Sequence, residues 1–343
     1  MKYGTRLPAA LLAALFLAIV FGCSSESSHE HQAESGTKTK EKQRFLAFGG
    51  GPTGGTFNFF ANKMSSEISN TYNYLDISPK GSGGSAENLR TLNKNAVDMG
   101  IVYSGDAFLG RNAKLPNDPN YYDGVQALAF LYGAPAQLIT HRGANINSVH
   151  DLVGRTVAVG NPGSGAALAA ERFFRHLGIW DRIGHRTLGY SQAAADFSDK
   201  RIDAFWVLVG YPNSSIIEAA TRSRVKLVDL HTDAVKSGFY DKYPFYTRVV
   251  IPAGTYEGQT APVETFQDAA LWCASEKLDA EIVQDGLTAV FSEQGIKDII
   301  TAHKAARDMS VQHALTGISI PLHPGAVSFW QEKGLTIPAS MLP

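Results

Sequence analysis

The chain has 343 residues, which is enough for two domains that each bury a core of their own. Its 31 basic and 32 acidic side chains nearly cancel, so the formal net charge is only −1. Because the charge is balanced and no stretch is rich in Lys or Arg, the sequence gives no sign of a nucleic-acid partner.

The N-terminus has the pattern of a secretory signal. Lys2 and Arg6 form a short basic start, and residues 7–21 are a nearly unbroken apolar run. That run is shorter than the about 20 residues of a comfortable membrane span and fits the apolar region of a signal peptide. It ends in Val20-Phe21-Gly22-Cys23, which resembles a bacterial lipobox. We therefore expect residues 1–22 to be a lipoprotein signal peptide of an exported protein, with Cys23 lipidated; ordinary cleavage nearby or an uncleaved anchor are the alternatives.

Residues 23–43 are predicted to be a flexible, lipid-anchored tether. After Cys23 this stretch contains a single apolar residue, Ala33, and many charges. Such a composition cannot bury enough apolar surface to fold. His29 and His31 lie in it, but no cluster of ligand spacing completes a metal site, so we expect a solvated pair and no bound metal.

From Arg44 onward, short β-type runs alternate with helical runs. In the first set, strands and helices alternate over residues 44–48, 57–68, 72–78, 85–94 and 97–102, with Ser85 as the expected N-cap of its helix. In the second set, strands are predicted at 137–140, 156–159, 204–209, 226–230 and 246–251, and helices at 166–176 and 213–222. The C-terminal part is predicted to be mainly helical, with helices at 280–290 and 295–305. This β-α-β order predicts parallel sheets with covering helices.

The loops after the predicted strands are rich in Gly, Ser and Thr. Four of them occupy residues 49–56, 80–85, 103–106 and 160–165. In an open α/β sheet, ligands bind at the carboxyl ends of the strands, and helices that begin there offer free N–H groups and a positive dipole end. We therefore expect these loops to surround one small anionic or zwitterionic solute; turns without a ligand are the alternative.

The first loop also satisfies a dinucleotide-binding fingerprint, Gly49-x-Gly51-x-x-Gly54, with Asp76 at a suitable distance. Pro52 removes a backbone donor from that loop, and an exported protein meets little nicotinamide cofactor. A dinucleotide-dependent enzyme therefore stays an alternative, and no cofactor is predicted. Other enzyme motifs are absent from the sequence: it has no P-loop, no Gly-x-Ser-x-Gly and no His-Glu-x-x-His. Cys273 lies in an apolar run and is expected to be a small core residue without chemistry.

Motifs recur in order through residues 45–334. They are Gly54–Phe57, Gly83–Leu89, Val97–Val102, Asp151–Gly160, Gly163–Gly165, Ile202–Phe205, Gly210–Asn213, Tyr243–Tyr246, Ile251–Tyr256 and His323–Ala326. Their order and spacing resemble the TAXI family of solute receptors of tripartite ATP-independent periplasmic (TRAP) transporters. Two positions depart from the family pattern: Ala166 stands where Thr is common, and Trp206–Val209 is more apolar. These departures put the usual ligand in doubt and leave the fold unaffected.

The resemblance implies an α/β, type II periplasmic-binding-protein fold with two lobes joined by crossing hinge strands. Residues 44–136 and 252–343 are expected to form the first lobe and residues 137–251 the second, with crossings near Gln137 and near 246–251. It also implies a small carboxylate or amino-acid ligand, such as glutamate or 2-oxoglutarate, and delivery to TRAP integral membrane subunits. A ligand-presenting sensor and a receptor for an ATP-driven (ABC) importer are the alternatives of the same fold.

We therefore expect a non-enzymatic receptor that closes over one solute. The residues expected to line its site are Gly55, Thr56, Phe57, Ser82, Gly83, Ser85, Tyr103 and Asp106 from the first lobe, and Ser164, Gly165 and Tyr211 from the second. The four loops contain no arginine, although Lys80 and Arg90 lie nearby. A carboxylate is therefore expected to be held by backbone N–H groups and by Ser and Thr hydroxyls.

The lipid anchor can be tested directly. Cys23→Ser is expected to release the protein from membranes, because no later segment of the sequence is long and apolar enough to anchor it. Fractionation of cell membranes measures the outcome. A processed Cys23→Ser protein that still sediments with the membranes would contradict the assignment.

Overall fold

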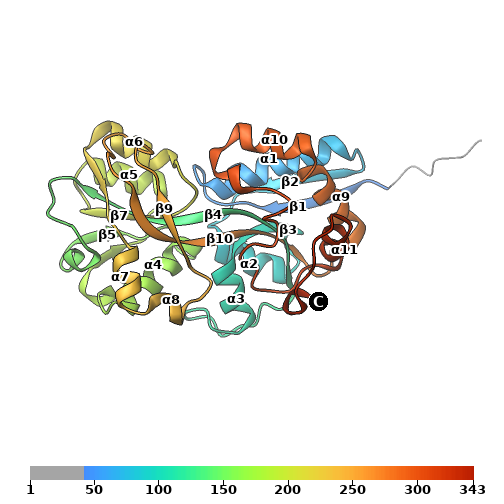
Figure 1. The fold of residues 1–343 in the computed structure, drawn as a ribbon, viewed down its shortest axis with the longest axis horizontal. Coiled ribbons are helices and arrows are strands. Elements are labelled where there is room, and N and C mark those ends of the chain that lie inside the picture. The colour runs from blue at the N-terminus through green and yellow to red at the C-terminus, as the bar shows by residue number, and fades with distance from the viewer. Residues whose placement is uncertain (1–41) are drawn as a thin grey trace, which may run out of the picture. The chain divides into compact units, whose positions relative to one another are not determined.

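The computed structural model describes residues 42–343, which fold into a two-lobed α/β protein (Figure 1). The predicted signal peptide, Cys23, His29 and His31 lie outside the described residues, as does nearly all of the predicted tether. Within residues 42–343, no helix combines the length and apolarity that a membrane span requires.

The chain builds most of the first lobe before it enters the second. The first lobe contains β1 (Arg44–Gly49), α1 (Thr56–Thr71), β2 (Leu75–Lys80), α2 (Ser85–Asn93), β3 (Met99–Tyr103) and α3 (Ser104–Arg111). The strand β4 (Val125–His141) leads into the second lobe, which contains β5 (Thr156–Ala158), α4 (Gly165–His176), β6 (Gly184–Arg186), α5 (Tyr190–Ser198), β7 (Ala204–Leu208), α6 (Ser214–Arg222), β8 (Val225–Leu227), α7 (His231–Lys236), α8 (Phe239–Lys242) and β9 (Thr247–Ile251). The strand β10 (Val263–Ser275) returns to the first lobe, where α9 (Ala280–Val290), α10 (Glu293–Ala302) and α11 (Pro324–Glu332) follow.

The strands form one ten-stranded sheet in the order β2-β1-β3-β10-β4-β7-β5-β6, with β8 beside β4 and β9 beside β10. Within the first lobe β1 is parallel to β2 and β3, and within the second β5 is parallel to β6 and β7. The two long strands are antiparallel to each other and pair from Gln267↔Pro135 to Ser275↔Val125. They run from one lobe to the other in Figure 1, so each lobe keeps a parallel βα core and both share the middle of the sheet.

The element order confirms the predicted alternation of strands and helices. It could be predicted because the helices are amphipathic. On α1, the buried residues Phe57, Phe60, Ala61, Met64 and Ile68 recur every three or four positions, which places them on one face toward the sheet. On α4 the same spacing buries Ala166, Ala169, Ala170 and Phe173. Most element ends differ from the predicted ones by a few residues, but β4 begins at Val125, twelve residues before the strand predicted at 137–140.

The C-terminal prediction missed one strand. The helices α9 and α10 were expected, but β10 was not, and a crossing strand had been expected at 246–251. That segment is β9, which pairs with β10 through Val263↔Ile251 to Gln267↔Thr247. From Ala270 to Ala274 every residue of β10 is buried, so the strand lacks the alternation that distinguishes a strand from a buried helix. Cys273 lies in this run, fully buried as expected, and burial raises the pKa of its thiol.

Aromatic side chains fill the core of the second lobe where β10 passes through it. Phe266 of β10 is fully buried, with its ring centroid 4.9 Å from Phe173, 5.0 Å from Phe239 and 4.9 Å from Tyr246. Contacts of this kind add specific geometry to the apolar area that they bury. The strand therefore contributes directly to the core of the lobe as well as connecting the two lobes.

We predict that Phe266→Ala lowers the free energy of unfolding by about 3–5 kcal/mol, because it leaves a cavity among packed rings. The matched control is Phe45→Ala, since Phe45 is 76 % exposed on β1; it should change stability by no more than about 0.5 kcal/mol. Urea denaturation of both variants measures the difference. Equal effects would contradict this view of the core.

Candidate functional site

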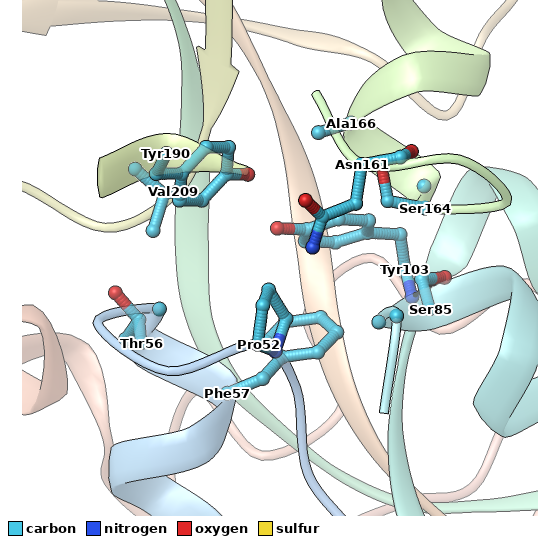
Figure 2. Close-up of a pocket in the computed structure, with 14 residues that line it drawn as sticks. Pro52, Thr56, Phe57, Ser85, Tyr103, Asn161, Ser164, Ala166, Tyr190 and Val209 are labelled. Carbon is cyan, nitrogen blue, oxygen red and sulfur yellow. Dashed lines mark hydrogen bonds between the residues drawn. The ribbon is translucent and has the colours of Figure 1, made fainter. Parts of the chain in front are cut away.

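A cavity lies between the lobes, at the carboxyl ends of the strands of each βα unit (Figure 2). Its first-lobe lining is Pro52, Gly55, Thr56, Phe57, Gly83, Gly84, Ser85 and Tyr103, and its second-lobe lining is Asn161, Ser164, Gly165, Ala166, Tyr190 and Val209. The empty space is about 360 Å³, including the part that opens to solvent. Small-molecule sites are concave and lined mainly by apolar groups with a few polar ones, as this cavity is.

Four helices begin at the wall of this cavity. Their first residues are Thr56 of α1, Ser85 of α2, Gly165 of α4 and Tyr190 of α5. The first N–H groups of a helix have no partner within it and carry the positive end of the helix dipole. In α1, α2 and α5 the N-cap residue is a glycine, and no side chain caps the helix. Several N–H donors are therefore left to a ligand.

The cavity attracts negative charge without containing a cation. None of the described residues that line it is charged. Arg90 lies outside it, where its Nε donates to Asp118 Oδ2 at 2.9 Å. Backbone donors and dipole ends that converge on one point are a recognised anion-binding arrangement. The site can therefore hold a carboxylate or another small anion by backbone hydrogen bonds.

One buried side chain holds the loops of the first lobe in place. The Asn88 amide of α2 donates to the carbonyl oxygens of Gly49 at 3.2 Å, Gly50 at 2.6 Å and Ile101 at 2.8 Å. It thereby ties the ends of β1 and β3 to the start of α2. Gly84 precedes that helix at a φ of 116°, a conformation that side-chain-bearing residues rarely adopt. These features fix the positions of the backbone N–H donors at the start of α2 in the absence of a ligand.

Two tyrosines supply acceptors beside the donors. The hydroxyls of Tyr103 and Tyr190 both donate to the carbonyl oxygen of Leu208, at 2.5 Å and 3.1 Å. Burial raises the pKa of both hydroxyls, which keeps them protonated. With the proton used, the oxygen of each can only accept from a ligand. The Asn161 side chain points into the same space (Figure 2), so the cavity suits a solute with both an anionic group and an N–H or O–H group.

The structure brings together most of the predicted site residues. Eight of the eleven line the cavity: Gly55, Thr56, Phe57, Gly83, Ser85, Tyr103, Ser164 and Gly165. Two of their hydroxyls are already engaged within the protein. Ser85 Oγ donates to Asp106 Oδ2 at 2.7 Å and accepts from the Tyr103 N–H. Ser164 Oγ caps α4, accepting from Ala167 N–H at 3.1 Å and donating to the Asn161 carbonyl.

Three predicted site residues lie elsewhere. Ser82 supports the loop, donating to the Gly50 carbonyl at 3.0 Å. Asp106 is buried behind the cavity wall and forms an ion pair with Arg172 at 3.2 Å. Tyr211 lies under the guanidinium of Arg307, 4.1 Å from the ring centroid. The expectation that Ser85 is the N-cap of α2 was wrong, because Gly84 holds that position and the Ser85 side chain serves Asp106 and Tyr103 instead.

Sequence reasoning missed six lining residues, namely Pro52, Gly84, Asn161, Ala166, Tyr190 and Val209. Tyr190 belongs to a fifth strand-to-helix loop, in which Gly189 precedes α5. The strand before it, β6, has three exposed residues and so gave no strand signal. A search for Gly followed by a helical run would have found the loop. Ala166 was noted as a departure from the family pattern, and it contributes apolar surface to the cavity.

Gly165 lies where the two lobes pack closely against each other. A Cβ atom there would lie 2.4 Å from Asp106 Oδ2, 2.6 Å from Tyr103 Cδ2 and 2.7 Å from Ser85 Cβ, all of them atoms of the first lobe. Real side chains do not approach so closely, so only glycine lets the lobes meet here. The described conformation is thus a closed one, and the residue at position 165 decides whether closure is possible.

These features define a class: a two-lobed α/β protein with the fold of the periplasmic-binding-protein type and a cavity between its lobes. Residues 48–334 match the model of the NMT1-like family, and the chain belongs to that family. Among solved structures, it is similar to MatC from Rhodopseudomonas palustris with bound malate, at 13% identity and a TM-score of 0.52 over 84% of this chain and 97% of that one. It is also similar to the periplasmic aliphatic sulphonate binding protein SsuA from Escherichia coli, at 16% identity and a TM-score of 0.43 over 76% and 79% of the chains. At these identities the likeness concerns the fold.

We predict that Gly165→Ala prevents full closure, because its methyl group would overlap three first-lobe side chains. Under the solution condition that gives the wild type its smallest radius of gyration, the variant should keep a larger one by small-angle X-ray scattering. Gly81→Ala is the control, since a Cβ atom there meets nothing within 4 Å. A wild-type radius for Gly165→Ala would show that the lobes do not need this contact.

Proposed function

We propose that the protein is an exported, non-enzymatic solute receptor that closes over one small carboxylate or amino-acid-like solute. The observation that carries the proposal is the convergence of four helix N-termini on a cavity without a charged side chain. Binding that depends on backbone N–H groups needs little rearrangement and leaves no buried cation unpaired when the solute departs. Both properties suit a protein that must release what it binds.

Delivery to a TRAP membrane transporter is the finer part of the proposal. It is supported by the ordered TAXI-like motifs, several of which lie at the cavity, such as Gly54–Phe57 and Gly163–Gly165. A lipid on Cys23 would anchor the receptor to a membrane, facing the periplasm or the cell exterior. Receptors for ATP-driven importers and ligand-presenting sensors share the fold. A gene for a TRAP membrane subunit beside the gene for this protein would favour the TRAP receptor over these two alternatives.

The hinge of the proposed receptor lies in the two long strands. We take residues 44–136 as the first part of the first lobe and place the start of the second lobe at 137, within β4. The return crossing is β10, so the boundary at 251/252 moves into residues 263–275. In this division each lobe contributes two of the four helix N-termini, and closure is what completes the site.

Direct identification of the solute tests the proposal. Mass spectrometry of compounds released from purified, denatured protein is expected to show a small carboxylate, and isothermal titration calorimetry with L-malate, L-glutamate and 2-oxoglutarate is expected to show saturable binding of at least one. Chemical turnover of the bound compound would contradict a receptor without enzymatic activity. Binding of no small anion at all would contradict the assignment of the cavity.

We predict that Thr56→Val weakens binding about ten- to a hundredfold, because it removes one hydroxyl at the wall of the cavity and keeps the shape of the side chain. Arg90→Gln should change the affinity much less, since Arg90 is paired with Asp118 outside the cavity. Titration calorimetry of both variants measures the contrast. If Arg90→Gln abolished binding and Thr56→Val left it intact, the backbone-and-hydroxyl site would be wrong.

A further inference from the structure

Three charged side chains are buried together behind the cavity, where the lobes meet. They are Asp106 of α3 in the first lobe, Arg172 of α4 in the second and Asp268 of the shared strand β10. Their exposed fractions are 1 %, 5 % and 1 %. Charged side chains are rarely buried to this extent unless each has a partner.

Two of the three are fully partnered. Arg172 Nη2 donates to Asp106 Oδ1 at 3.2 Å, its Nη1 donates to the Tyr246 hydroxyl, and Ser85 Oγ donates to the second oxygen of Asp106 at 2.7 Å. Asp268 differs: its Oδ1 accepts from the backbone N–H of Gly105 at 3.1 Å, and within residues 42–343 it forms no ion pair. The cluster therefore has one guanidinium for two carboxylates.

With both carboxylates ionised, the cluster would bury one uncompensated negative charge. The other titratable groups that face it are Tyr103, Tyr243 and Tyr246. Burial raises the pKa of Tyr103 and of Tyr246, so these two hydroxyls stay neutral. Burial lowers the pKa of Arg172, but Tyr246 and the two carboxylates outweigh it and hold the guanidinium charged. An unpaired charge in a dry interior is costly, whereas one proton on a carboxylate makes the cluster neutral.

Asp268 is the carboxylate that takes this proton. Both carboxylate oxygens of Asp106 already accept hydrogen bonds from side chains, one from Arg172 and the other from Ser85. Burial first, and the neighbouring Asp106 second, raise the pKa of Asp268 to about 8. In water an aspartate has a pKa of about 3.9 and is ionised at neutral pH.

Contacts between the two lobes cover this cluster. Gly165, about two turns before Arg172 on the same helix, packs directly against Asp106, Tyr103 and Ser85. The Phe245 ring covers the other side, 5.6 Å from the guanidinium and against Gly105. Because Arg172 belongs to α4 of the second lobe and Asp106 to α3 of the first, a separation of the lobes would pull this pair apart and uncover the cluster.

We propose that the protein binds a proton at Asp268 whenever its lobes close, so that it takes up one proton together with its solute. The inference rests on the proposed function, because closure is what solute binding drives. The closed state then holds one proton more than the open state between the two pKa values, which lie near 4 and near 8. By linkage, the affinity for the solute is highest at the acidic end of this range. It falls about tenfold per pH unit until the pH passes the pKa of Asp268 in the closed state.

Titration calorimetry with L-malate, L-glutamate and 2-oxoglutarate tests this, at about pH 6 and about pH 7.5 in buffers of different ionisation enthalpy. The wild type is expected to take up about one proton per bound solute, and its Kd should rise about thirtyfold between the two pH values. Asp268→Asn, which is isosteric and cannot ionise, should take up none and lose most of the pH dependence. Asp76→Asn removes an exposed carboxylate of β2 and should behave as the wild type.

The outcomes separate the two proposals. If none of the probes binds, the proposed function fails. If a probe binds the wild type without proton uptake, the proton at Asp268 is refuted and the receptor stands. A carboxyl-carbon NMR titration of aspartate-labelled wild type needs no variant to fold: with a bound probe it should show one aspartate titrating near pH 8, and its absence would equally overturn the inference.

Discussion

The antiparallel pairing of β4 with β10 is the constraint on which the rest of the molecule depends. Both strands belong to both lobes, and their pairing extends from Gln267↔Pro135 to Ser275↔Val125. Because each lobe adds its parallel strands to an opposite end of this pair, the carboxyl ends of the two sets of strands face each other. The cavity, the helix N-termini and the contact at Gly165 all follow from that opposition.

The electrostatics of the site are divided between two layers. The layer that faces the solute offers partial charges from backbone N–H groups and helix dipoles, and none of its lining residues is charged. The formal charges lie one layer behind, in Asp106, Arg172 and Asp268. Ser85 and Tyr103 connect the layers, since both line the cavity and Ser85 bonds to Asp106. The charged layer thus lies where the lobes meet, and none of its three side chains lines the cavity.

Much of the fold and the site could be predicted from local pattern. The βα alternation follows from apolar residues at helical spacing, as on α1. The glycine-rich loops were expected at the strand ends, and eight of the residues named from them line the cavity. β10 was not predicted because a strand buried on both faces lacks the alternation of apolar and polar residues. β6 was not predicted because its three residues are all exposed and give no strand pattern.

By itself the sequence determined the alternation of strands and helices and the positions of four of the loops that connect them, because these depend on residues a few positions apart. Only the tertiary structure decided how polar side chains are used. Arg172 and Asp106 are 66 positions apart in the sequence, so no local pattern predicts that they form a pair. Asp106 was expected to contact the ligand, but it forms a buried ion pair with Arg172. The Ser85 hydroxyl donates to the same carboxylate. The physical reason is that a buried charge needs a partner, and that partner is set by which elements the fold packs together.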